Sequence, residues 1–476
     1  MTKLARETEL FEQAPVPQAI LRLALPAIFG QVILVLYNLA DTFFIGLTGS
    51  DANLTAVTVC MPAFLWLSAV SNLFGVGGAS EMSRCLGRKE PERASAASGF
   101  SVSGCAGVTL LYSLAVFLFL DPVIDLLGGI HPEVHALCRS YLLTTVVLGG
   151  FGTAMNALLS HLVRAEGRSA AASAGIMGGG ILNILLDPLF MFHLLPRGQE
   201  VFGAGLATAL SNLSAMCYFL VILRRNRRRS VLRLFPGRER PDRALVLSIL
   251  SVGLPACVMT LMENVSYAVL DNLLSSGGIA VQAGIGVAKK VNMLAHCTVR
   301  GLTQGVLPLI AYSFASGNHE RMRQTVRYAA VAAVSMASLW TAFSLAAARP
   351  LIGLFIQNSG SSLENGVLFL RILCLGGPFS ACAYTFISFF QAVGQGFRSF
   401  ILALLRKGLV DIPLMIILSR RLPVAGPVAA TPLADAFCCL CAVLLFREFL
   451  YMQRRTDAFP RLSPQRQTTW TGGAHR

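Results

Sequence analysis

Twelve apolar stretches, each long enough to cross a lipid bilayer, recur along this chain of 476 residues. A spanning helix needs about 20 apolar residues, and helices satisfy their own backbone groups in lipid. Only 13% of the residues are charged, against about 25% in soluble domains. The sequence therefore predicts an all-α polytopic membrane protein. The predicted spans are 19–46, 53–80, 95–120, 136–163, 170–194, 202–224, 244–274, 279–312, 325–348, 366–393, 397–419 and 424–449.

The net charge of +15 reflects loops rather than a nucleic-acid partner, because Lys and Arg gather in the cytoplasmic loops of membrane proteins. Basic residues follow the even-numbered spans, and Arg420 and Arg421 after the eleventh span are the exception. We therefore expect a multi-pass protein of the plasma membrane with both termini cytoplasmic. The first 20 residues lack the pattern of a cleavable signal. The twelve cysteines lack paired ligand spacing, so we expect reduced thiols and no metal cluster.

The chain consists of two similar halves. Leu25-Pro26 in the first span matches Leu254-Pro255 in the seventh, and the motif G-x-x-E-x-x-R begins at both Gly87 and Gly317. Six spans in each half give both halves the same orientation, which suits a transporter with its substrate between two lobes. The predicted parts are a cytoplasmic N-terminal segment (1–18), an N-lobe (19–224), a basic cytoplasmic linker (225–243), a C-lobe (244–452) and a cytoplasmic tail (453–476).

Carboxylates within the spans are the main functional candidates, because charge is costly in a bilayer. Asp41 in the first span follows Tyr37 by four residues, and Asp187 in the fifth follows Asn183 by four, so each pair shares a helix face. Two adjacent carboxylates share a proton or hold a bound cation such as Na⁺. The alternative is structural: Asp41 hydrogen-bonds a broken helix, and Asp187 marks a helix end.

The C-half offers a second group of candidates. Glu263 and Asp271 lie eight residues apart in the seventh span, and Lys290 near the start of the eighth is a predicted ion-pair partner for either. The group is either a structural ion pair or a substrate or coupling site, and Asp271 alternatively lies at the outer interface. No P-loop, His-Glu-x-x-His or Gly-x-Ser-x-Gly motif occurs. We therefore expect a secondary transporter, which is not an enzyme and needs no cofactor.

Several motifs together resemble those of the MATE (multidrug and toxic compound extrusion) family, and most closely its MepA-like bacterial branch. They are LPAIFG and YNLADTFFIG in the first span, the two G-x-x-E-x-x-R loops, NILLDPLF in the fifth span and GVLPLIAYSFASGN closing the eighth. The resemblance implies twelve helices in two six-helix lobes. It further implies export of cationic, amphipathic drugs in exchange for H⁺ or Na⁺ by alternating access, by a protein we expect to be monomeric.

The resemblance also implies a cation site in the N-lobe. The matching residues are Tyr37, Asp41, Asn183 and Asp187, with Thr208 as a fifth member. Glu263 matches a carboxylate that some members use, but residues 380–383 lack the Asp that accompanies it in the tenth span, which favours the N-lobe site. A flippase of lipid-linked oligosaccharide, or a metabolite exporter on a related scaffold, is the alternative that Arg300 and Lys290 leave open.

Overall fold

The computed structural model describes residues 9–227, 230–235, 241–356 and 360–458, and within them the chain is helical with no β-strand. Parts of three predicted segments lie outside the described residues: 1–8 of the N-terminal segment, 228–229 and 236–240 of the linker, and 459–476 of the tail.

Six helical units form the first half, and their bounds follow the predicted apolar runs closely. They are α2 (Val16–Leu47), α3 (Asp51–Gly87), α4 (Pro91–Leu118) with the short α5 (Leu120–Leu127), the unit of α6 (Pro132–Leu142), η1 (Leu143–Leu148) and α7 (Gly150–Ala165), α8 (Ser169–Pro188) with η2 (Leu189–Leu194), and α9 (Glu200–Arg225).

Six further units form the second half. They are α10 (Arg243–Ser275), α11 (Ile279–Ala315), α12 (His319–Ala346) with the short α13 (Ala348–Gly353), the pair α14 (Ser361–Cys374) and α15 (Gly377–Ala392), the unit of α16 (Gly396–Leu404), η3 (Leu405–Leu409) and α17 (Asp411–Ser419), and α18 (Ala425–Ala458).

The prediction of twelve helices in two lobes is confirmed. Eight described helices are long and apolar enough to span a bilayer singly, and two bent units raise that number to ten. The bends are 47° between α6–η1 and α7, and 44° between α14 and α15. The remaining two units, α11 and α16–α17, both carry Lys and Arg side chains within the apolar run.

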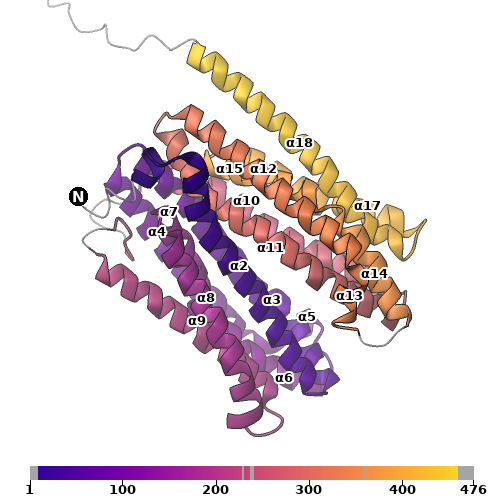
Figure 1. Ribbon diagram of the computed structural model, residues 1–476. Helices are drawn as coiled ribbons and strands as arrows, with labels where there is room; N and C mark the ends of the chain where they lie inside the picture. Colours follow the sequence, from indigo (N-terminus) through magenta and orange to yellow (C-terminus); the bar gives the residue numbers. More distant parts are fainter. Residues whose placement is uncertain (1–8, 228–229, 236–240, 357–359, 459–476) are drawn as a thin grey trace, which may run out of the picture.

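The two lobes lie side by side, close together at the end where α2 begins and farther apart at the other (Figure 1). They meet where α2 packs against α11 and α3 against α10. The contact brings backbone onto backbone: a Cβ on Gly253 of α10 would collide with the main chain of Leu73 in α3, and one on Gly301 of α11 would lie 2.5 Å from the Cα of Ile28 in α2. We call the end where the lobes meet the closed end.

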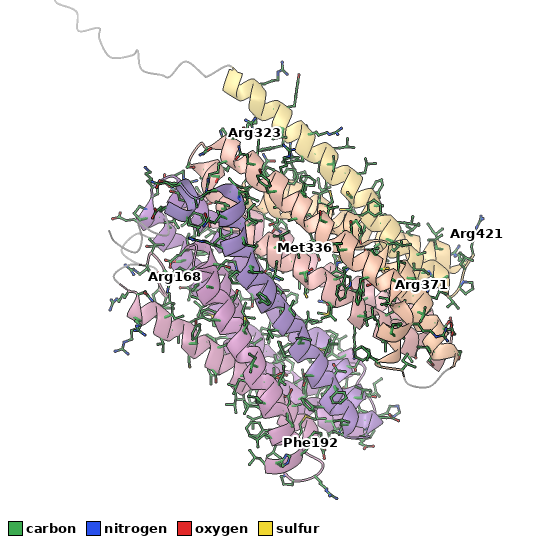
Figure 2. The ribbon with its side chains drawn as sticks, viewed as in Figure 1. Arg168, Phe192, Arg323, Met336, Arg371 and Arg421 are labelled. Atoms are coloured by element: carbon green, nitrogen blue, oxygen red, sulfur yellow. The ribbon has the colours of Figure 1, made fainter. Side chains whose placement is uncertain are left out.

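Basic side chains lie at both ends of the molecule. Arg168 and Arg323 lie toward the closed end, whereas Arg371 and Arg421 lie at the opposite end (Figure 2). Arg421, which with Arg420 follows the eleventh predicted span, thus lies at the end opposite to Arg168 and Arg323 (Figure 2).

The N-terminal segment contacts both lobes at the closed end. Phe11 is buried and stacks on Tyr312 of α11, with ring centroids 5.1 Å apart. The Tyr312 hydroxyl donates a 2.7 Å hydrogen bond to Glu12. On the other side, the Phe11 ring lies beside Gly167 of the N-lobe. This short segment therefore helps to hold the closed end together.

Candidate functional site

The five predicted cation-site residues come from three adjacent helices of the N-lobe. Asp41 of α2 is 6% exposed, and Asp187 of α8 is fully buried. The Asn183 side-chain amide donates to Asp187 Oδ1 at 3.2 Å and to Thr208 Oγ1 of α9 at 3.4 Å. Tyr37 packs against α8 at Gly180, where a Cβ would lie 3.4 Å from its ring. The predicted residues of α8 and α9 are thus in contact, and Tyr37 of α2 packs beside them.

This cluster contains acceptor atoms that lack donors. Asp41 Oδ1, Asp187 Oδ2 and Asn183 Oδ1 are buried and receive no hydrogen bond, and among the described residues no Lys, Arg or His lies within ion-pair distance of either carboxylate. The two carboxylates are close enough to interact electrostatically. Buried acceptors normally have partners, so this set of oxygens suits a proton or a small cation.

Tyr141 is a neighbour that the sequence reasoning missed. It lies in α6, is 2% exposed, and is within electrostatic reach of Asp41, Asp187 and Tyr37. Its only signal in the sequence is a phenol in the apolar fourth span, which does not indicate the side it faces.

The C-lobe candidates are ion-paired, but not as predicted. Glu263 pairs with Arg300, whose Nη2 also donates to the Tyr384 hydroxyl at 2.8 Å. Asp271 pairs with Lys289. The predicted pairing of Lys290 with Glu263 or Asp271 is therefore wrong. Adjacent helical positions point about 100° apart, so the side chain that meets α10 is that of Lys289.

Two further buried ion pairs involve the α16–α17 unit, one to α18 and one within the unit. Arg406 Nε donates to Asp435 Oδ1 of α18 at 2.8 Å, and both side chains are 2% exposed. Lys407 Nζ pairs with Asp411 Oδ2 at 3.2 Å. The Ser266 hydroxyl donates to the same Asp411 carboxylate at 2.6 Å. The sequence analysis missed Arg406, Lys407 and Asp435, whose signal was charge within an apolar span.

The carboxylates that the internal repeat relates have different ion-pair partners in the two halves. Asp41 lies 15 residues after Pro26 and Asp271 lies 16 after Pro255, so the internal repeat relates these two carboxylates. It also relates Asp187 to Asp411, because Asp187-Pro188-Leu189 resembles Asp411-Ile412-Pro413-Leu414 with one residue inserted. Asp271 and Asp411 each pair with a lysine, whereas Asp41 and Asp187 have no counterion among the described residues. The two halves therefore differ in whether these carboxylates have a counterion among the described residues.

A cavity of about 100 Å³ lies between the lobes, where α3 and α7 face α10, α11 and α15. It is partly open and mixes apolar with polar walls. Glu263 and Arg300 face it from the C-lobe, and Arg164 faces it from the N-lobe. The cavity is where a substrate could contact both lobes at once.

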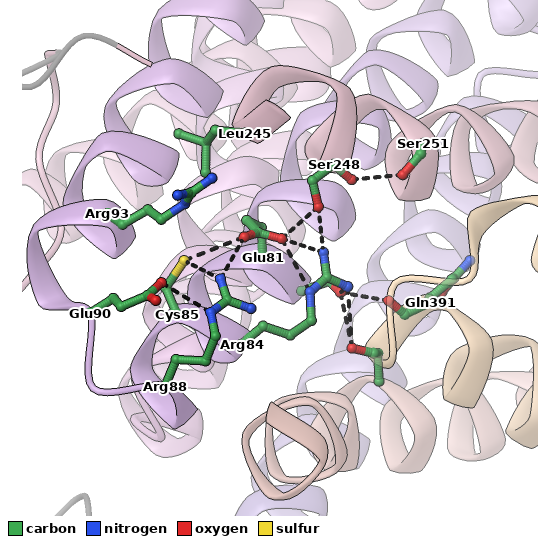
Figure 3. A network of polar contacts seen from close by, with 12 residues as sticks. Glu81, Arg84, Cys85, Arg88, Glu90, Arg93, Leu245, Ser248, Ser251 and Gln391 are labelled. Atoms are coloured by element: carbon green, nitrogen blue, oxygen red, sulfur yellow. Dashed lines mark hydrogen bonds and ion pairs between the residues drawn. The ribbon is translucent and has the colours of Figure 1, made fainter. Parts of the chain in front are cut away.

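A polar network joins the lobes beside this cavity, at the closed end (Figure 3). Glu81 of α3 forms an ion pair with Arg84 and accepts a 3.1 Å bond from Arg88 Nη2. Arg84 Nη2 in turn donates to the Ser248 hydroxyl of α10 at 2.9 Å. The predicted span ended at residue 80 and left Arg84 in a loop. The helix instead continues to Gly87, because pairing satisfies these buried charges.

Comparisons with known proteins agree with this architecture. The family model described as MatE matches residues 26–189 and again residues 255–417, one match in each half. The chain is 28% identical to the multidrug export protein MepA of Staphylococcus aureus strain MRSA252, over 91% of this chain and 94% of that one. It is 26% identical to MepA of Staphylococcus saprophyticus, with the same coverage.

Solved structures show the same fold. A MATE crystal structure in complex with MaL6 superimposes with a TM-score of 0.86 at 24% identity, covering 95% of this chain and 100% of the other. An outward-facing multidrug resistance MATE family transporter of the MOP superfamily gives 0.85 at 24% identity, covering 94% and 98%.

Proposed function

This chain belongs to the MatE family of transporters, and on that premise we propose that it exports cationic, amphipathic drugs in exchange for H⁺ or Na⁺. The observation that carries the proposal is the carboxylate pair of the N-lobe, Asp41 and Asp187, which has no counterion among the described residues. The relatives named as multidrug export proteins support drugs as the cargo.

The exchange follows from a cation and a drug favouring opposite conformations. A cation from outside binds Asp41 and Asp187, with Asn183, Thr208 and Tyr37 completing the site, and stabilises the drug-releasing state. A drug entering between the lobes favours the cation-free state. A ligand shifts a conformational equilibrium only through its differential affinity for the two states, and the coupling of the two ligands is reciprocal.

The proposal places the protein in the plasma membrane as a monomer, with both termini and the closed end on the cytoplasmic side. The state described here then faces outward. The flippase alternative depended on Arg300 and Lys290, but Glu263 neutralises Arg300. In the same proposal the lysine-paired Asp271 is structural, and Glu263 contacts the drug from the C-lobe.

The substitution Asp41→Asn tests the proposal. We expect it to abolish ethidium efflux from cells at unchanged protein abundance, whereas Asp125→Asn, at an exposed position, preserves efflux. Wild-type efflux in the Asp41 variant would disprove the coupling role. Efflux measured with and without a protonophore, and in sodium-free buffer, identifies the ion.

A further inference from the structure

Arg164, which lines the cavity between the lobes, is a buried cation without a partner among the described residues. It lies in the last turn of α7, is 2% exposed, and faces the cavity. Its three guanidinium nitrogens, Nε, Nη1 and Nη2, are all buried and donate to no acceptor in the described part of the chain. An isolated buried charge is strongly unfavourable, so a guanidinium with every donor unused indicates a missing acceptor.

The surroundings of Arg164 do not supply that acceptor. Glu263 is the carboxylate that faces the same cavity, and it is already bound to Arg300. His161 precedes Arg164 by almost one turn on α7 and is not an anion. The Ser83 hydroxyl of α3 donates to the Ala165 carbonyl at 3.3 Å, which holds this turn of α7 in place. The unpaired charge is therefore a fixed property of the cavity wall.

The volume of the cavity limits which chemical group can act as the acceptor for Arg164. Its volume of about 100 Å³ holds a small polar group and is too small for a whole drug. A carboxylate fits, and it matches the planar donor fork of arginine with two parallel hydrogen bonds. The rest of such a ligand extends from the cavity between the lobes. In the conformation described, the three nitrogens are covered, so contact with a carboxylate requires the end of the Arg164 side chain to turn toward the cavity.

We propose that Arg164 binds a carboxylate of the cargo, so that the transporter prefers zwitterionic amphipaths, which carry a carboxylate as well as a positive charge, over purely cationic ones. The inference rests on the proposed export function and refines its substrate class. Because the Glu263–Arg300 pair is neutral overall, Arg164 is the one uncompensated charge among the described residues that line the cavity, and it is positive. A purely cationic drug therefore meets repulsion there, and a carboxylate removes it.

Two dyes that differ in this one group test the proposal: rhodamine B, a zwitterion with a free carboxylate, and its ethyl ester, a cation. Equilibrium binding is measured by fluorescence on the purified full chain. We expect the wild type to bind rhodamine B about tenfold more tightly than the ester, equivalent to about 1.4 kcal/mol. Equal affinities, or tighter binding of the ester, would overturn the inference.

Variants then assign the preference to Arg164. The substitution Arg164→Gln should abolish the preference for rhodamine B: its affinity should fall, whereas the affinity for the ester should stay the same or rise, because the repulsion of the cation is gone. Arg164→Lys, which keeps the charge but loses the fork, should retain part of the preference. The control Arg168→Gln, at a residue that pairs with Glu166 outside the cavity, should change neither affinity. A parallel loss for both dyes in Arg164→Gln would indicate a structural role and refute the inference.

Transport in proteoliposomes separates this inference from the proposed function. If the wild type transports neither dye, the export function fails, while the binding measurements still decide the role of Arg164. If the wild type transports the ester and rhodamine B at the same relative rates as Arg164→Gln, export stands and the inference fails. If Arg164→Gln does not fold, the wild-type affinities and Arg164→Lys decide the result.

Discussion

The Ser248 hydroxyl of α10 donates a 2.6 Å hydrogen bond to the Glu81 carboxylate of α3, across the closed end of the two lobes. The carboxylate is shared, because it also pairs with Arg84 and Arg88 on its own lobe. The bond to Ser248 therefore joins the lobes without contributing to the folding of either one alone.

Removing this bond should loosen the closed end. The substitution Ser248→Ala removes about 1 kcal/mol of hydrogen bonding and leaves the Glu81–Arg84 pair intact. We expect hydrogen exchange at the adjoining ends of α3 and α10 to rise about fivefold. The matched control is Ser251→Ala, whose exposed hydroxyl donates only within α10. Equal exchange in the two variants would show that the bond does not hold the lobes together.

The buried counterion of Asp411, Lys407, should contribute strongly to the stability of the C-lobe. Lys407→Met leaves Asp411 buried without its cation, which typically costs about 3–5 kcal/mol. We expect a clear fall in the thermal unfolding midpoint, and partial recovery in Lys407→Met/Asp411→Asn, where the unpaired charge is gone. Lys290→Met, which removes a lysine without a described ion pair, is the control. Equal destabilisation by the two single substitutions would contradict this account.

Glu166 should fasten the linker between the lobes to the N-lobe. Its carboxylate accepts bonds from the Ser230 hydroxyl at 2.6 Å and from the Val231 and Leu232 amides at 2.9 and 3.2 Å. Burial raises the pKa of Glu166, so glutamine at this position would resemble the protonated side chain and keep an acceptor oxygen. Alanine removes the acceptor and is therefore the sharper test. We expect trypsin to cut the linker at least about fivefold faster in Glu166→Ala, a loss of about 1 kcal/mol. Unchanged cleavage, as expected for the exposed control Glu133→Ala, would argue against this attachment.

The backbone contact at Gly253 should set how closely the lobes meet. Gly253→Val places a side chain against the main chain of Leu73, where no room exists, and overpacking typically costs about 1–3 kcal/mol. We expect drug efflux to fall and exchange at the closed end to rise, at unchanged abundance. Gly286→Val, where a new Cβ meets open space, should keep wild-type efflux. A loss of efflux in both variants would point to a general helix defect.

The sequence predicted the helices well because apolar length and helical period are local properties. The N-lobe cluster was also within reach, since four-residue spacing places Tyr37 beside Asp41 and Asn183 beside Asp187, and the bond between Asn183 and Asp187 is present. The counterion of Asp271 was not predictable in the same way, because the choice between Lys289 and Lys290 depends on the rotation of α11 against α10.

Arg164 shows a different limit. Its position after the fourth predicted span suggested a loop residue that sets the topology. The last turn of α7 instead buries it, and its lack of partners is a property of every neighbouring helix rather than of its own segment. Missing contacts of this kind have no signature in a single sequence.

The lysine-bound carboxylates of the C-lobe also bear on how steep a drug gradient the protein can sustain. Asp271 and Asp411 are paired with lysines that stay attached to the chain, so the proposed exchange assigns no transported ion to them. Under the proposed exchange, the driving force of one cycle comes from the ions of the N-lobe pair alone. Each monovalent ion supplies about 1.4 kcal/mol per tenfold concentration gradient and about 2.3 kcal/mol per 100 mV. The steepest drug gradient the protein can sustain is therefore fixed by the number of ions that Asp41 and Asp187 release together.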